Sequence, residues 1–138
     1  MELFEYIKPG MRMERYFAVD AEFTAKKVGS GTARVLSTPS MIAFMERTSR
    51  DLLAQYIPKG FSSVGVEVNV RHVAPTPMGG SVRIMSEVLK VDELRVLFSV
   101  NAWDDIEKVG EGEHQRVVID EARFLRRVES KRETLSQP

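Results

Sequence analysis

Residues 37–57, STPSMIAFMERTSRDLLAQYI, predict one buried helix. Thr38 stands where a helix N-cap is expected, and Pro39 suits the first helical position because proline lacks the N–H that would be unsatisfied there. Apolar residues run almost without a break from Met41 to Met45. We therefore expect other structure to cover this helix on most sides, until the PKG sequence that follows ends it.

The hydrophobic period changes from helical to two in residues 61–74, FSSVGVEVNVRHVA. Valines occupy every even position from Val64 to Val70, which indicates a half-buried strand. His72 continues this even series, so its side chain should lie on the face that packs against the helix, unless a β-bulge intervenes. The sequence thus predicts that His72 faces the helix.

The rest of the chain supplies more strands, joined by short turns that imply antiparallel neighbours. They are expected at residues 11–25, 81–91, 94–104 and 109–119, with a glycine-rich loop at 26–37. A short basic helix should run from about Glu121 to Arg132, with a frayed tail from about residue 133. The prediction is one α+β domain over residues 1–138, an antiparallel sheet of about five strands wrapped around a long central helix.

Composition excludes several classes of function. The chain has 138 residues, 43% of them hydrophobic, which suits one domain with one core. Lysine plus arginine and aspartate plus glutamate number 20 each, so no overall field favours nucleic acid or an anionic membrane. Without cysteine there are no disulfides, thiolate nucleophiles or cysteine-ligated metals. Lacking a signal or membrane segment, the chain is expected in the cytoplasm with a small-molecule partner.

Motifs for metals and nucleotides are also absent from the sequence. The two histidines, His72 and His114, have no metal-ligand spacing, and the GSG at residues 29–31 lacks the lysine of a phosphate loop. Five basic residues in the C-terminal helix could contact an anion, but a solvated helix face is the favoured interpretation. They are Arg123, Arg126, Arg127, Lys131 and Arg132.

Glu46 places a carboxylate inside the apolar stretch of the predicted helix. Eight residues separate it from Thr38, which on a helix is about 80° of rotation and about 12 Å of rise. The two side chains share a broad face but cannot touch. If Thr38, Glu46 and His72 serve one site, either a substrate lies between them or the partner subunit of a dimer completes the set.

Each of these residues also has a purely structural interpretation. Glu46 could form a helical ion pair with Arg50, four residues later. Thr38 could be only a helix cap, and His72 only a hydrogen-bonded core residue. Arg116 could be a solvated strand residue paired with an acid, and His114 is expected to be structural.

Thr38, Glu46 and His72 nevertheless resemble the Thr-Glu-His set of the fluoroacetyl-CoA thioesterase family of hot-dog-fold proteins. Their separations of 8 and 26 residues match that family's, as do the strand carrying GVEVNVRHVAPTP and the sequence GEGEHQRVVI. The resemblance extends from about residue 9 to residue 123. It implies the hot-dog fold, a catalytic role for the three residues, and acyl-group contacts for Gly65 and Arg116.

The resemblance has one departure that bears on the substrate. The fluoroacetyl-specific enzyme has a longer segment with phenylalanine before the helix, whereas this chain has only VGSGTARVLS at residues 28–37. We therefore expect thioester hydrolysis of some small acyl group rather than fluoroacetyl specificity. No cofactor is expected, since coenzyme A is part of the substrate.

The chemistry of thioester hydrolysis suits these residues. Thr38 and backbone N–H groups at the helix start would stabilise an oxyanion, Glu46 would attack or activate water, and His72 would move the proton. A non-catalytic acyl-CoA binding or sensing module is the main alternative, and a hot-dog dehydratase or hydratase is a weaker one. Because hot-dog proteins pair two subunits around the acyl cleft, we expect a homodimer, or a dimer of such dimers.

Overall fold

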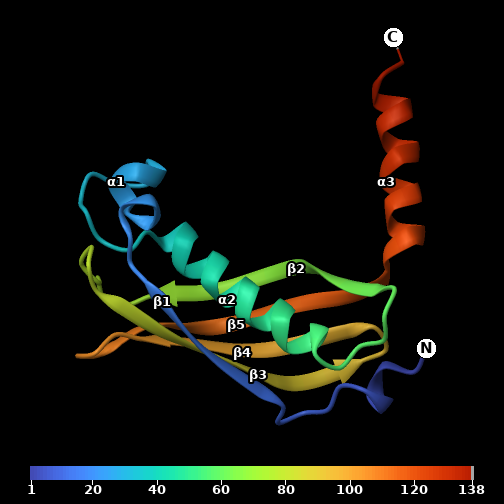
Figure 1. Cartoon of the computed structure of the whole chain (residues 1–138), viewed down its shortest axis with the longest axis horizontal. Helices are drawn as coiled ribbons and strands as arrows, with labels where there is room; N and C mark the ends of the chain where they lie inside the picture. Colours follow the sequence, from blue (N-terminus) through green and yellow to red (C-terminus); the bar gives the residue numbers. More distant parts are fainter. Residues whose placement is uncertain (138) are drawn as a thin grey trace.

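One antiparallel sheet packs against a single long helix in the computed structural model, which describes residues 1–137 (Figure 1). The strands are β1 (Arg12–Ala18), β2 (Phe61–His72), β3 (Ser81–Asp92), β4 (Arg95–Trp103) and β5 (Lys108–Asp120). The helices are α1 (Ala25–Val28), α2 (Thr38–Ala54) and α3 (Glu121–Leu135), with 3-10 turns at Leu3–Glu5 and Ala21–Phe23. The strand order is β1-β3-β4-β5-β2, with every neighbouring pair antiparallel. This is the predicted α+β layout, and it leaves β1 and β2 as edge strands.

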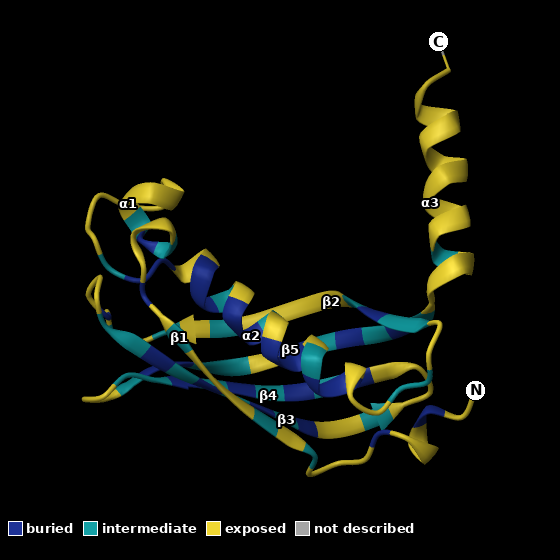
Figure 2. Cartoon of the chain, viewed as in Figure 1, coloured by how far each residue is buried: buried dark blue, intermediate teal, exposed yellow. Residues whose placement is uncertain are grey.

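The core lies between α2 and the sheet. Helix α2 contacts all five strands, and Figure 2 shows its buried residues on the side toward them. Phe44 of α2 and Phe98 of β4 are fully buried, and Phe17 of β1 stacks on Phe44 with ring centroids 4.3 Å apart. Burying side chains of this size stabilises the fold by about 1.5–3 kcal/mol each. The central helix is thereby held firmly against the sheet.

The start of α2 differs from the prediction by one residue. Ser37, not Thr38, is the N-cap, and its Oγ accepts a hydrogen bond from the backbone N–H of Ser40 at 3.1 Å. Two backbone hydrogen bonds fix the chain just before the helix, from Leu36 N–H to Thr76 O and from Ser37 N–H to Phe23 O. Because these bonds hold Ser37 in an extended conformation, the helix begins at Thr38 and leaves the Thr38 side chain free of capping.

A β-bulge at Val66 divides β2 into two registers. Gly65 pairs with Arg116 before the bulge, and Val68 pairs with His114 after it. Odd-numbered residues therefore face α2 before the bulge and even-numbered residues face it afterwards. The interpretation of the valines as one continuous inner face was wrong for Val64 and Val66, which line an outer groove beside α3. His72 lies on the predicted face.

Three element bounds also differ from the predictions. β1 ends at Ala18 rather than near residue 25, and the 3-10 turn at Ala21–Phe23 and helix α1, capped by Thr24, occupy the rest of that stretch. α2 ends at Ala54, before the PKG sequence. α3 continues to Leu135, beyond the expected end at Arg132, and projects past the edge strand β2 (Figure 1). Within residues 1–137, no helix is both long enough and apolar enough to cross a membrane.

Candidate active site

Thr38 and His72 form a hydrogen-bonded pair at the N-terminal end of α2. The Oγ1 atom of Thr38 lies 2.8 Å from Nδ1 of His72, and either atom can be the donor. His72 is the last residue of β2, opposite Gly110 of β5. Gly110 faces α2 closely enough that a methyl group there would collide with Met41. The helix and the end of β2 thus bring together two of the three residues predicted from the sequence.

The second ring nitrogen of His72 is buried without a hydrogen-bond partner. Burial lowers the pKa of His72, partly opposed by the backbone of Ala74, so the neutral imidazole is favoured. A cleft of about 310 Å³ opens beside the pair, and Thr38 and His72 line it together with Leu36, Val73 and Pro75. A neutral imidazole, a hydroxyl and apolar walls at one opening are suited to a small, polarisable substrate group.

Glu46 lies elsewhere along α2, above Gly65 of β2. A methyl group placed on Gly65 would be 2.9 Å from Glu46 Oε2, 3.2 Å from His114 Cε1 and 3.4 Å from Arg116 Nη1. The alternative of a Glu46–Arg50 ion pair is wrong for the described residues, because Arg50 pairs with Asp51 at 2.9 Å. The missing side chain of Gly65 therefore allows the Glu46 carboxylate and the Arg116 guanidinium to approach this strand closely.

Arg116 is 6% exposed, so the alternative of a solvated strand residue is wrong. Its Nε donates to Ser63 Oγ at 2.9 Å, its Nη2 donates to Ser63 O at 3.0 Å, and its Nη1 lies 3.2 Å from His114 Nε2. Burial lowers the pKa of Arg116, and the nearby Glu46 opposes that shift. Among the ion pairs of residues 1–137 none includes Arg116, so neutral groups hold this buried cation.

The five predicted site residues therefore form two groups within one chain. Thr38 and His72 lie at the start of α2, whereas Glu46 stands near Gly65 and Arg116 about two helical turns along. No hydrogen bond joins Glu46 to His72 among the described residues. His114, which was expected to be structural, lies in the Glu46 group. Its position in the sequence gave no sign of this, because the bulge in β2 determines which residue it pairs with.

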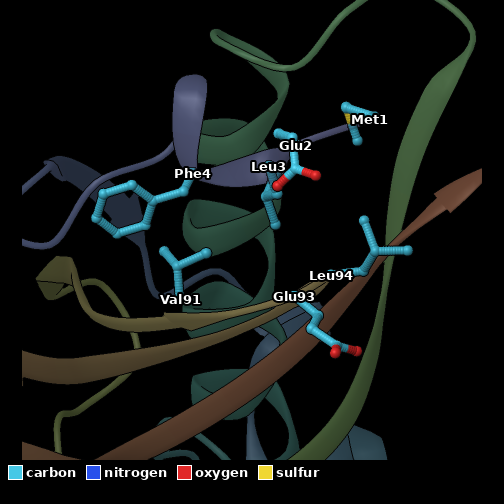
Figure 3. Close-up of a pocket in the computed structure, with 7 residues that line it drawn as sticks. All are labelled: Met1, Glu2, Leu3, Phe4, Val91, Glu93 and Leu94. Carbon is cyan, nitrogen blue, oxygen red and sulfur yellow. The ribbon is translucent and has the colours of Figure 1, made fainter.

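A separate hollow of about 430 Å³ lies between the N-terminal segment and the turn joining β3 to β4 (Figure 3). Glu2 and Glu93 are the charged residues that line it. Two carboxylates would repel a polyanion such as coenzyme A. None of the predicted site residues borders this hollow, so it is a poor candidate for the predicted site.

The fold is that of a hot-dog protein. All five strands of one antiparallel sheet contact one long helix, and polar residues lie between the sheet and the helix. The family model described as fluoroacetyl-CoA-specific thioesterase matches residues 19–122. The fluoroacetyl-CoA thioesterase of Streptantibioticus cattleyicolor is 33% identical over 97 residues, which is 70% of each chain. The chain therefore belongs to the fluoroacetyl-CoA-specific thioesterase family, a family of thioester hydrolases.

Solved structures give the same fold over nearly the whole chain. A mutant of the fluoroacetyl-CoA-specific thioesterase FlK, in complex with fluoroacetate and CoA, is 28% identical with a TM-score of 0.81, covering 86% of this chain and 99% of that one. A hot-dog-like protein from Thermanaerovibrio acidaminovorans is 27% identical with a TM-score of 0.88, covering 95% and 97%. The predicted fold and the suspected family are both confirmed.

Proposed function

We propose that this protein hydrolyses the thioester of a small acyl-CoA to a carboxylate and free coenzyme A. The observation that carries the proposal is the Thr38–His72 pair, which opens onto a cleft while His72 Nε2 is buried and unpartnered. A hydroxyl fixed by a neutral imidazole at a helix N-terminus suits a carbonyl oxygen that gains negative charge. The complex of FlK with fluoroacetate and CoA shows that a related chain accommodates both products of such a reaction.

Thr38 and the start of α2 would stabilise the oxyanion. The N–H of Ser40 already donates to Ser37 Oγ, and Pro39 has no N–H. The Thr38 N–H and the Thr38 hydroxyl are therefore the donors of the first turn that are left for an oxyanion. Removing an oxyanion donor costs about 2.7–4 kcal/mol of transition-state stabilisation in a well-studied case. The positive end of the helix dipole adds to this effect.

Glu46 is the group that would act on the acyl carbon. It either attacks that carbon and forms an anhydride that water then opens, or takes a proton from the attacking water directly. In both routes the C–S bond breaks, the oxygen of water ends on the acyl carbon, and the thiolate leaves with little need for protonation. His72, neutral and unpartnered at Nε2, would transfer the proton.

We further propose that two copies of the chain complete each site. Along α2 the separation of Thr38 from Glu46 corresponds to about 12 Å, too far for both to act on one carbonyl. β2 is an edge strand, and its Val66 and Val68 are 47% and 39% exposed. An unprotected apolar edge favours pairing with a second copy, which would bring Thr38 and His72 of one subunit toward Glu46 of the other.

Gly65 and Arg116 are proposed to contact the acyl group, because both lie beside Glu46, the group proposed to act on the acyl carbon. Residues 28–37 contain no aromatic side chain, so the fluoroacetyl specificity of the relatives is not part of the proposal. The reaction needs no cofactor, and coenzyme A enters only as part of the substrate. The cytoplasm stays the predicted compartment.

Thiol release from a panel of short, branched and aromatic acyl-CoAs tests the function. We expect turnover with at least one acyl group, and a loss of about a hundredfold or more in Glu46→Gln and in His72→Ala. Circular dichroism and melting curves must show that both variants are folded. Arg71→Gln is the matched control, since Arg71 is an exposed β2 residue paired with Glu111 and should leave turnover unchanged.

Other results would point to the alternatives. Tight acyl-CoA binding without thiol release by the wild type would favour a binding or sensing module. Conversion of the acyl chain with the thioester intact would favour a dehydratase or hydratase. The Thr38, Glu46 and His72 set favours hydrolysis, because a pure binder has little use for a carboxylate beside an electrophilic carbonyl.

A further inference from the structure

His114 of β5 makes two hydrogen bonds from a fully buried position. Its Nδ1 lies 2.8 Å from the backbone oxygen of Glu67, and its Nε2 lies 3.2 Å from Arg116 Nη1. A carbonyl oxygen can only accept, so Nδ1 carries the proton. Nε2 then has a lone pair and accepts from the Arg116 guanidinium. The two contacts together define one tautomer of a neutral histidine.

The Glu67 carbonyl belongs to the bulge of β2. The register shift lies between Gly65 and Glu67, and it is this shift that turns His72 toward α2. His114 is therefore bonded to β2 at the residue where the strand changes from odd-numbered to even-numbered residues facing α2. The same imidazole fixes Nη1 of Arg116, the guanidinium nitrogen nearest Gly65.

Arg116 depends on this bond for its direction. Ser63 accepts hydrogen bonds from Nε and Nη2 of Arg116. Among the described residues, only His114 accepts a hydrogen bond from Nη1. The bond also requires a neutral His114, because a proton on Nε2 would point at a cation. Burial lowers the pKa of His114, with Arg116 acting in the same direction and Glu67 O and Glu46 opposing it.

We propose that His114 is a positioning residue for the acyl-binding site. It holds Arg116 Nη1 beside Gly65 and Glu46, and it is itself held in place by the Glu67 carbonyl of the β2 bulge. The inference deepens the proposed function and rests on it. His114 would act on the substrate through Arg116, although its own Cε1 lies 3.2 Å from the position that a methyl group on Gly65 would take.

Nitrogen NMR of the wild-type imidazoles tests the hydrogen bonds without any substrate. We expect the His114 signals of a neutral ring protonated at Nδ1, with a pKa below the ordinary histidine value of about 6.5. In Arg116→Met, the His114 Nε2 signal should move toward that of a free lone pair. A ring protonated at Nε2, or one that titrates with an ordinary pKa, would overturn the proposal even if the protein hydrolyses acyl-CoA.

Two amide variants separate the two bonds. Gln at position 114 places its amide near the position of Nε2 and can still accept from Arg116, whereas Asn places its amide near Nδ1 and can bond only Glu67 O. In terms of kcat/KM for the best acyl-CoA, we expect His114→Gln to stay within about threefold of wild type and His114→Asn to lose about tenfold or more. In the Arg116→Met background, His114→Asn should cost nothing further.

These outcomes distinguish positioning from a merely structural role. Equal activity of the Gln and Asn variants, or a full Asn effect that persists in Arg116→Met, would overturn the proposal. Melting curves of all variants identify losses caused by unfolding. If the wild type hydrolyses no acyl-CoA, the proposed function fails, and the NMR experiment still decides whether His114 holds Arg116.

Discussion

Thr38 Oγ1 lies 2.8 Å from His72 Nδ1 because two neighbouring elements each depart from the simplest pattern. The helix is capped by Ser37, so the Thr38 hydroxyl is not used for capping. The bulge at Val66 shifts the register of β2, so that His72 faces the helix while Gly65, an odd-numbered residue, faces it too. The site thus depends on a cap and a bulge as much as on the polar residues themselves.

Thr38→Val should separate catalysis from capping. Valine keeps the shape of threonine but lacks the hydroxyl, so we expect kcat to fall by about a hundredfold if Thr38 stabilises an oxyanion. The free energy of unfolding should change little, since Ser37 supplies the cap. Thiol release and urea unfolding measure the two quantities.

Ser37→Ala is the matched control for that variant. It removes the bond to Ser40 N–H and should cost about 1 kcal/mol of unfolding free energy, while changing kcat far less than Thr38→Val. If instead Thr38→Val destabilises the fold as much as Ser37→Ala and leaves kcat intact, Thr38 is a structural residue.

Gly65→Ala should displace the Glu46 carboxylate. The added methyl group would lie 2.9 Å from Glu46 Oε2, so the carboxylate must move, and 3.4 Å from Arg116 Nη1. We expect KM to rise or kcat to fall by about tenfold or more, with a melting temperature within a few degrees of wild type, because Gly65 is exposed and the carboxylate is a mobile side-chain end. Kinetics on the best acyl-CoA and a thermal melt provide the check.

Gly112→Ala gives the contrasting result in the same strand pair. A methyl group there would collide with the backbone oxygen of Asn69 rather than with a movable side chain. We expect loss of folding or a large drop in melting temperature, since paired backbone cannot give way locally. If Gly65→Ala behaved in the same way, the glycine at position 65 would be a packing requirement and not part of a binding site.

The sequence predicted the layers and the facing residues better than it predicted local detail. Val64 to Val70 correctly indicated a strand, but the bulge at Val66 breaks the period of two, and a bulge leaves no mark that distinguishes it from plain alternation in GVEVN. Ser37 and Thr38 are both good caps, and only the backbone bonds of Leu36 and Ser37 decide between them. His114 looked isolated because its partners, the Glu67 carbonyl and Arg116, meet it only through strand pairing.

Stability should fall as the pH drops from about 7.5 to about 5.5. The pKa values of both His72 and His114 are lowered by burial, so below the ordinary histidine value of about 6.5 the unfolded chain binds protons that the folded chain does not. Their contribution is fully present above that pH and is lost as the pH falls toward the folded pKa values. Urea unfolding at several pH values measures the slope.

A double variant, His72→Gln with His114→Gln, is the control for this slope. Both glutamines are uncharged at every pH, so the unfolding free energy should become nearly constant between about pH 7.5 and pH 5.5. An unchanged slope in the double variant would assign the pH dependence to other groups.

In the wild type, kcat should also have an acid limb below about pH 6.5, because His72 must be neutral to accept a proton.

Mixed dimers should reveal which subunit supplies each residue. Light scattering is expected to show a homodimer, or a dimer of dimers, and co-refolding equal amounts of Glu46→Gln and His72→Ala chains should give half mixed dimers. If Glu46 of one subunit works with His72 of the other, a mixed dimer has one site with both substitutions and one intact site. Activity should then recover to about a quarter of wild type, although each variant alone is nearly inactive.

The same mixture has a definite opposite outcome. If each chain supplies its own Glu46 and His72, every site in every dimer carries one substitution and the mixture stays inactive. A mixture of Glu46→Gln with Thr38→Val should behave like the first pair, because Thr38 and His72 lie on the same chain in hydrogen-bond contact. A mixture of Thr38→Val with His72→Ala should not recover, since an intact Thr38–His72 pair is then absent from every subunit.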